Sequence, residues 1–147
     1  MVGIIKTDTR KLHCGGSLIH PNWILTASHC FFEFGKLLDL EKTNLTAIFG
    51  TDDLGLVPDE KKYRSDKRRG KFEEQPILTY LVHEKYKPGV AYNDVALAFV
   101  SQVKFSSRIF PICIPNLPIV FQDHLKNNAV DVLGYSLEVP YNYEGTI

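Results

Sequence analysis

The sequence predicts an all-β protein built as a barrel or a sandwich. Short runs rich in β-branched and aromatic residues recur along the chain, and turn-forming residues separate them. Residues 77–83 alternate, with Leu78, Tyr80 and Val82 on one face of the expected strand. Residues 95–100 are apolar on both faces, so we expect them to form a central strand that is buried on both sides.

Seven runs are expected to form strands, because their residues favour extended backbone and turn-forming residues lie at their ends. They comprise residues 2–5, 15–19, 23–27, 46–50, 77–83, 95–100 and 130–134, with turns over residues 6–11, 20–22 and 51–53. The last run is expected to enter a new layer. Residues 31–40 are apolar at mixed spacing, and a helical turn is expected among them.

Size and composition indicate a globular domain. The 147 residues suffice for one domain with a core, and 44% hydrophobic with 23% charged residues excludes a disordered chain. Lys plus Arg equals Asp plus Glu at 17 each, so the charge balance does not favour nucleic acid or an anionic membrane as partner. No apolar run approaches the roughly 20 residues that cross a bilayer, and the start of the chain is too short and too soon polar for a signal peptide.

The most strongly charged segment is the basic stretch from Lys61 to Lys71. The simplest interpretation is a solvated surface loop. The alternatives are an exosite for an acidic substrate or partner, and a processing site at Lys67-Arg68-Arg69. Tyr63 is the only aromatic residue within the stretch, which argues against nucleic-acid binding.

Two motifs carry residues suited to catalysis. Leu25-Thr26-Ala27-Ser28-His29-Cys30 follows Cys14-Gly15-Gly16-Ser17, and Tyr92-Asn93-Asp94-Val95-Ala96-Leu97 lies later in the chain. A histidine takes up and returns a proton near neutral pH, and a carboxylate fixes the tautomer of its ring. In this order the motifs resemble the histidine and aspartate loops of trypsin-like serine proteases, which have the chymotrypsin fold.

Two further segments extend the resemblance. Pro111-Ile112-Cys113-Ile114-Pro115 is similar to a Pro-flanked cysteine motif of these proteases, and Leu133-Gly134-Tyr135-Ser136 is similar to their Thr-Gly-Trp-Gly segment. The resemblance implies the first antiparallel β-barrel of a double β-barrel, together with the crossover into the second, so that residues 1–147 are part of a catalytic domain. It also implies a secreted, extracellular endopeptidase that cleaves protein or peptide substrates without a cofactor.

The resemblance assigns catalytic roles to His29, as general base and acid, and to Asp94, as the carboxylate that orients it. The nucleophilic serine of the family lies in a Gly-Asp-Ser-Gly-Gly segment of the second barrel, and no such segment occurs in these 147 residues. Because a base and its carboxylate cannot transfer an acyl group without a nucleophile, we expect the chain alone to be an inactive fragment of a serine endopeptidase. The alternatives are a non-catalytic homologue acting as a binding or regulatory module, and a truncated product.

The resemblance also pairs two of the three cysteines, Cys14 and Cys30, in a disulfide that would stabilise the fold by about 3 kcal/mol. The alternative is two free buried thiols in a reducing compartment. The third, Cys113, corresponds to a cysteine that in many such proteases joins the catalytic domain to a propeptide or an upstream domain. The alternative expectation is that Cys113 is a buried thiol without a disulfide partner.

Other chemistry is sparse in the sequence. Asn44-Leu45-Thr46 is an acceptor triplet for N-linked glycosylation in a secreted protein. Some members of the family bind calcium between the fourth and fifth strands, where the basic stretch of this chain is ill suited to a dication. The remaining histidines show no metal-site spacing and are interpreted as surface or packing residues: His13, His20, His83 and His124.

Overall fold

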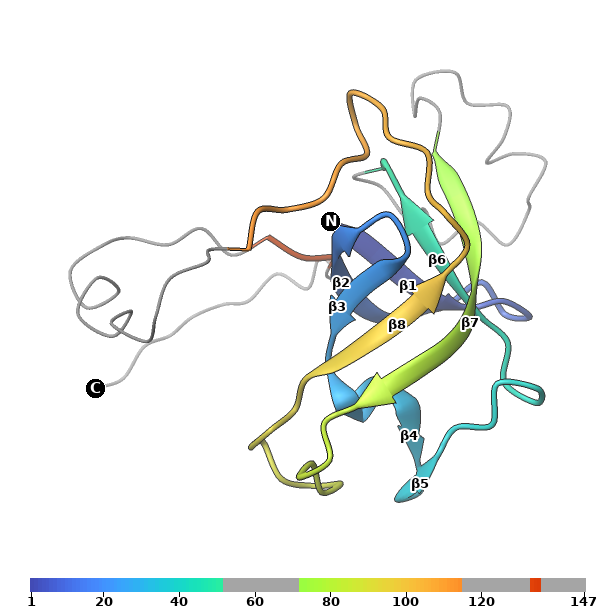
Figure 1. Ribbon diagram of the computed structural model, residues 1–147. Coiled ribbons are helices and arrows are strands. Elements are labelled where there is room, and N and C mark those ends of the chain that lie inside the picture. Colours follow the sequence, from blue (N-terminus) through green and yellow to red (C-terminus); the bar gives the residue numbers. More distant parts are fainter. Residues whose placement is uncertain (52–71, 115–132, 136–147) are drawn as a thin grey trace, which may run out of the picture.

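A computed structural model describes residues 1–51, 72–114 and 133–135 (Figure 1). These residues form a closed barrel of antiparallel strands in the order β1-β2-β3-β8-β7-β6. The barrel strands are β1 (Val2–Lys6), β2 (Leu12–His20), β3 (Trp23–Thr26), β6 (Leu45–Phe49), β7 (Glu73–Val82) and β8 (Ala96–Val100). A 3₁₀ helix, η1 (Ser28–Phe31), follows β3, and β4 (Phe32–Glu33) pairs with β5 (Lys36–Leu37) in a separate ribbon. The predicted all-β class is confirmed, and the architecture is a barrel.

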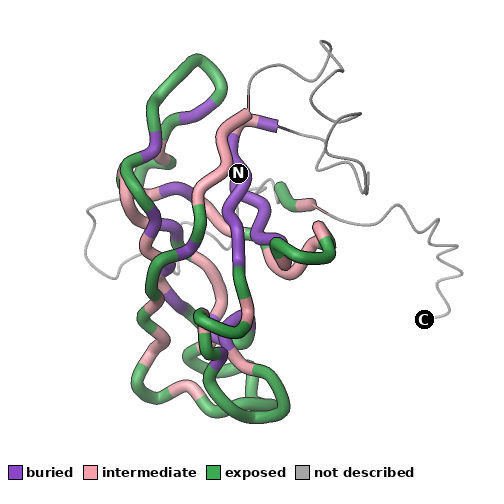
Figure 2. The backbone as a smooth tube through the Cα atoms, turned by 90° about the vertical axis from the view of Figure 1, so that its right-hand side faces the viewer, coloured by how far each residue is buried: buried purple, intermediate pink, exposed green. Residues whose placement is uncertain are grey.

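The strands that are buried on both faces are β1 and β6, which close the barrel. Every residue of β6 is buried, as are the first four of β1, and Val2 pairs with Phe49 at one end of their ladder. Figure 2 shows this buried stretch beginning beside the N-terminus. Aliphatic and aromatic side chains fill the interior, and the largest that are fully buried include Phe31, Phe49, Ile4 and Ile24.

Strand β8 is buried on its inner face only, so the prediction of burial on both sides is wrong. Ala96, Ala98 and Val100 face the core, whereas Leu97 and Phe99 are half-buried on the outside. The apolar outer positions instead line up with neighbouring strands, because Leu25 of β3 and Leu81 of β7 both pair with Leu97. An apolar row therefore crosses the outer surface of three strands.

A β-bulge in β7 changes which residues share a face. The pairing with β8 shifts register between Ile77 and Thr79. Ile77 is buried and Tyr80 packs against the core, but Leu78, which was expected to share a face with Tyr80, is 52% exposed. The extra residue of a bulge changes which of the following side chains face the core. The alternating pattern of the sequence does not show where such a bulge occurs.

The helical turn lies earlier than expected. It spans Ser28–Phe31, directly after β3, and residues 32–37 form the β4–β5 ribbon instead. Two residues, Phe34 and Gly35, connect the two short strands, with φ angles of 50° and 76°. Left-handed backbone at both positions is what a tight type I′ hairpin turn requires, and Gly35 favours it.

Some predictions fall on other parts of the chain. The basic stretch from Lys61 to Lys71 and residues 130–132 lie outside the described residues. Leu133 and Gly134 are described and are not in a strand. Within the described ranges, no helix has both the length and the apolar character needed to cross a membrane.

Two adjacent glycines of β2 provide a matched test of barrel packing. A methyl group at Gly16 would lie 2.8 Å from Ile24 Cγ2 and 2.9 Å from the Leu25 backbone oxygen, whereas one at Gly15 would meet nothing within 4 Å. We expect Gly16→Ala to lower the free energy of unfolding by roughly 1–3 kcal/mol because it overpacks the β2–β3 contact. Gly15→Ala should leave that free energy unchanged or raise it slightly. Urea unfolding of the two variants, followed by circular dichroism, checks this, and equal stabilities would contradict it.

Candidate active site

The pairing of β3 with β8 brings the two sequence motifs together. Thr26, at the end of β3, is the register partner of Ala96, at the start of β8. His29 lies just beyond Thr26 in η1, and Asp94 lies just before Ala96 in the preceding loop. In Figure 1, η1 and the start of β8 accordingly lie at the same end of the barrel.

His29 and Asp94 are joined by two hydrogen bonds. His29 Nδ1 lies 2.7 Å from Asp94 Oδ2, and the His29 backbone N–H donates to Asp94 Oδ1 at 2.8 Å. A carboxylate only accepts, so Nδ1 carries a proton, and in the neutral tautomer of the ring Nε2 has the lone pair. The His29 side chain is 61% exposed and that of Asp94 is 24% exposed. The pair is therefore an oriented imidazole with a solvent-accessible ring.

The environment of Asp94 favours its charged form. Burial raises the pKa of the carboxyl group, but the hydrogen bonds from the His29 ring and backbone outweigh it. The charge of the imidazole and the Ser28 backbone N–H act in the same direction, so the pKa of Asp94 lies below its ordinary value.

Ser28, directly before His29, forms hydrogen bonds to two other segments near the site. Its side chain is fully buried, and its hydroxyl donates to the Val95 carbonyl at 2.7 Å. The same hydroxyl accepts a bond from the His83 backbone N–H at 3.3 Å. Val95 follows Asp94, and His83 lies directly after β7. The Ser28 hydroxyl therefore links η1 to the end of β7 and to the loop that carries Asp94.

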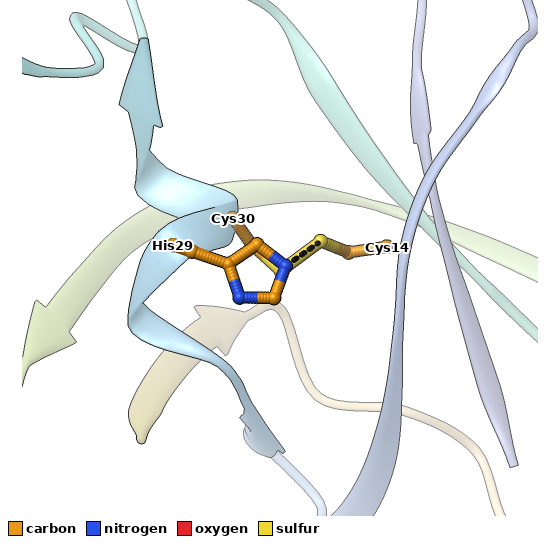
Figure 3. Close-up of side chains that lie close together, drawn as sticks. All are labelled: Cys14, His29 and Cys30. Carbon is orange, nitrogen blue, oxygen red and sulfur yellow. Dashed lines mark hydrogen bonds between the residues drawn. A yellow bond between two sulfur atoms is a disulfide. The ribbon is translucent and has the colours of Figure 1, made fainter. Parts of the chain in front are cut away.

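The Cys14–Cys30 disulfide lies directly behind the imidazole. Its Cα atoms are 6.1 Å apart, and His29 Nε2 is 3.9 Å from Cys14 Sγ and 3.7 Å from Cys30 Sγ (Figure 3). His13 Nε2 also lies 2.7 Å from the Cys30 carbonyl oxygen. Cys14, His29 and Cys30 have the residue types of a metal cluster, but both sulfur atoms are consumed by the disulfide and cannot act as thiolate ligands.

Comparison with known proteins assigns this chain to a family. Residues 1–137 match the family model for trypsin. The chain belongs to the trypsin family. It is 36% identical over 115 residues to vitamin K-dependent protein C of Rattus norvegicus, an alignment that covers 77% of this chain and 21% of that protein.

Two clotting factors align over nearly all of this trypsin-family chain. Limulus clotting factor C of Carcinoscorpius rotundicauda is 30% identical over 139 residues, which are 92% of this chain and 13% of that protein. The clotting factor G beta subunit of Tachypleus tridentatus is 30% identical over 141 residues, or 93% of this chain and 39% of that protein. The chain thus spans well under half the length of the curated relatives it matches.

The structure adds residues around the His29–Asp94 pair whose roles the sequence did not reveal. Ser28 and Asn93 stand inside the recognised motifs, but nothing in the motifs distinguishes them from their neighbours. The Tyr86 ring contacts Phe32 with centroids 5.3 Å apart, which joins the loop before Asp94 to the segment after His29. Burial, and then the charge of Asp94, raise the pKa of the Tyr86 hydroxyl.

Two other residues named from the sequence lie apart from this pair. Cys113 is a free, exposed thiol, so its interpretation as a buried thiol is wrong. Asn44 is exposed and lies directly before β6. Among the other described histidines, His20 and His83 each accept a backbone N–H through Nδ1, at Asn22 and Lys85 respectively, and neither contacts Asp94.

The pKa of Asp94 gives a pH-dependent prediction. Because folding lowers this pKa, the charged carboxyl stabilises the fold above its unfolded pKa of about 3.9, and the contribution is lost as pH falls through the lower folded value. We expect wild type to exceed Asp94→Asn in free energy of unfolding at pH 7, with the difference vanishing in acid. Urea titrations across that range measure it. Asp8→Asn, in the turn between β1 and β2, is the control, and a difference that does not vary with pH would contradict the expectation.

The backbone next to Asp94 gives a second prediction. Asn93 has a φ of 59°, and its backbone carbonyl accepts the Val95 N–H at 2.9 Å. Asparagine and glycine tolerate this left-handed conformation, but alanine does not, at a cost of about 1 kcal/mol. Asn93 is exposed, so truncation removes little packing. We expect Asn93→Ala to destabilise the fold by that amount and Asn93→Gly to remain near wild type in urea unfolding. The reverse order would show that the backbone conformation is not limiting.

Proposed function

We propose that this chain is part of a serine endopeptidase in which His29 is the general base and acid and Asp94 orients it. The observation that carries the proposal is the double hydrogen bond from His29 Nδ1 and the His29 backbone to the two oxygens of Asp94, at 2.7 and 2.8 Å. A module that acted only by binding would have no chemical need for a histidine whose ring and backbone are both held by one carboxylate.

The geometry supports the following sequence of proton transfers. With its proton on Nδ1, His29 accepts the proton of the nucleophilic hydroxyl at Nε2 as that hydroxyl attacks the scissile carbonyl. Asp94 stabilises the imidazolium that forms. The imidazolium then returns the proton to the leaving amine, and His29 next activates water to release the acyl group from the nucleophile.

The nucleophile, the oxyanion donors and the specificity pocket belong, in this proposal, to protein beyond these 147 residues. The relatives support this, because the chain aligns with only 13% to 39% of their lengths. Residues 1–147 then constitute part of a catalytic domain and are inactive alone. The substrates are proteins or peptides, in line with the family.

The cysteines support an extracellular location. The Cys14–Cys30 disulfide is of the kind that persists in oxidising compartments. The exposed thiol of Cys113 is accessible for a second disulfide, and we propose a propeptide or an upstream domain as its partner.

A chimera tests the assigned roles. Residues 1–137 replace the matching segment of an active trypsin-family protease, and hydrolysis of a peptide ester is measured. We expect activity in the chimera, with a loss in kcat of roughly 10⁶-fold for His29→Ala and roughly 10⁴-fold for Asp94→Asn, the sizes typical of such changes in serine proteases. His20→Ala, at an exposed histidine, should have no effect. Full activity of the His29 variant would refute the assignment, and labelling of the isolated chain by a fluorophosphonate would show that it holds its own nucleophile.

A further inference from the structure

We propose that Asn44 carries an N-linked glycan and that the glycan is attached before β6 pairs with β1. The inference rests on the secretory part of the proposed function, but not on the catalytic roles of His29 and Asp94. Asn44-Leu45-Thr46 is the only Asn-x-Ser/Thr triplet among the 147 residues. A glycan on this chain therefore has one possible site of this type.

The folded structure leaves room for a glycan at Asn44. The backbone is fixed, because the Asn44 carbonyl accepts the Thr7 N–H at 2.9 Å. The residue is exposed, and its carboxamide makes no hydrogen bond among the described residues. Asn44 thus presents a carboxamide to solvent from a rigid position at the edge of the barrel.

A polar hollow lies beside this carboxamide. It has a volume of about 160 Å³ and is lined by Lys6, Asp8, Lys42, Thr43 and Asn44 itself. Ammonium, carboxylate and hydroxyl groups can donate to and accept from the hydroxyl and acetamido groups of an N-acetylhexosamine. The hollow therefore offers hydrogen-bonding groups beside the point where a glycan would be attached.

The third residue of the triplet shows when attachment has to occur. Thr46 is only 7% exposed, and its hydroxyl lies 2.8 Å from the Thr7 hydroxyl. Within the barrel it is the register partner of Ile5 on one side and of Pro76 on the other. A transferase that must recognise this hydroxyl cannot reach it once the strands have paired, so attachment precedes closure of the barrel.

The chemical step uses an oligosaccharide carried on a lipid diphosphate. Asn44 Nδ2 forms a bond to the anomeric carbon of the oligosaccharide, and the bond between that carbon and the diphosphate oxygen breaks. The lipid diphosphate leaves with the bonding electron pair, and the displaced amide proton passes to a base of the transferase.

Expression with a secretion signal in eukaryotic cells tests the site. We expect peptide N-glycosidase to shift the secreted chain to higher mobility and to convert Asn44 to aspartate, detected by mass spectrometry. Asn44→Gln should abolish the shift, whereas Thr46→Ser, which keeps the hydroxyl, should retain it. A secreted chain that contains the Cys14–Cys30 disulfide but shows no shift would overturn the site and would leave the chimera assay unaffected.

A second experiment tests the order of events. The folded full chain, purified without glycan from bacteria, is incubated with the transferase and its lipid-linked donor, beside a synthetic peptide spanning residues 40–50. We expect the peptide to be modified and the folded chain to remain unmodified. Modification of the folded chain at the rate of the peptide would overturn the proposed order, even if the site itself is occupied in cells.

Discussion

The register of β3 against β8 is the constraint on which the site depends. Thr26 opposite Ala96 sets where each strand ends, and His29 and Asp94 follow from those ends. A slip of one residue would turn every side chain of β8 to the other face and move Ala98 out of the core. The small residues Ala96 and Ala98, which pack the barrel interior, thus fix the register that brings His29 into contact with Asp94. These two residues are far apart in the chain.

The polar groups around the contact between His29 and Asp94 form hydrogen bonds with one another. The Ser28 hydroxyl is completely buried, and it has both a donor and an acceptor within hydrogen-bonding distance. The oxygens of Asp94 receive both the ring and the backbone of His29. Because an unsatisfied buried polar group costs about 1–3 kcal/mol, the Ser28 hydroxyl restrains the segments that satisfy it. Hydrogen bonds thus hold His29 and Asp94 together, while the ring of His29 remains open to solvent.

Hydrophobic runs are local signals, so the sequence predicted the barrel strands, whereas the approach of His29 to Asp94 was predicted from the resemblance of their motifs to those of trypsin-like proteases. It could not predict the bulge at Ile77, since alternation in the sequence continues through it. Nor could it show that β1 and β6, rather than β8, are buried on both faces, because that depends on which strands close the barrel. The role of the Ser28 hydroxyl was hidden for a related reason, because its partners, Val95 and His83, lie far along the chain, just before β8 and just after β7.

The closed barrel has a consequence for how the chain is made. Val2 pairs with Phe49, and Trp23 pairs with Phe99, so the contact order is high and folding is expected to be slow. During synthesis β3 keeps an unpaired edge until Val100 has left the ribosome, and such edges attract other chains. The cellular yield of this protein should therefore depend on the pace of translation and on chaperones as well as on the stability of the finished barrel.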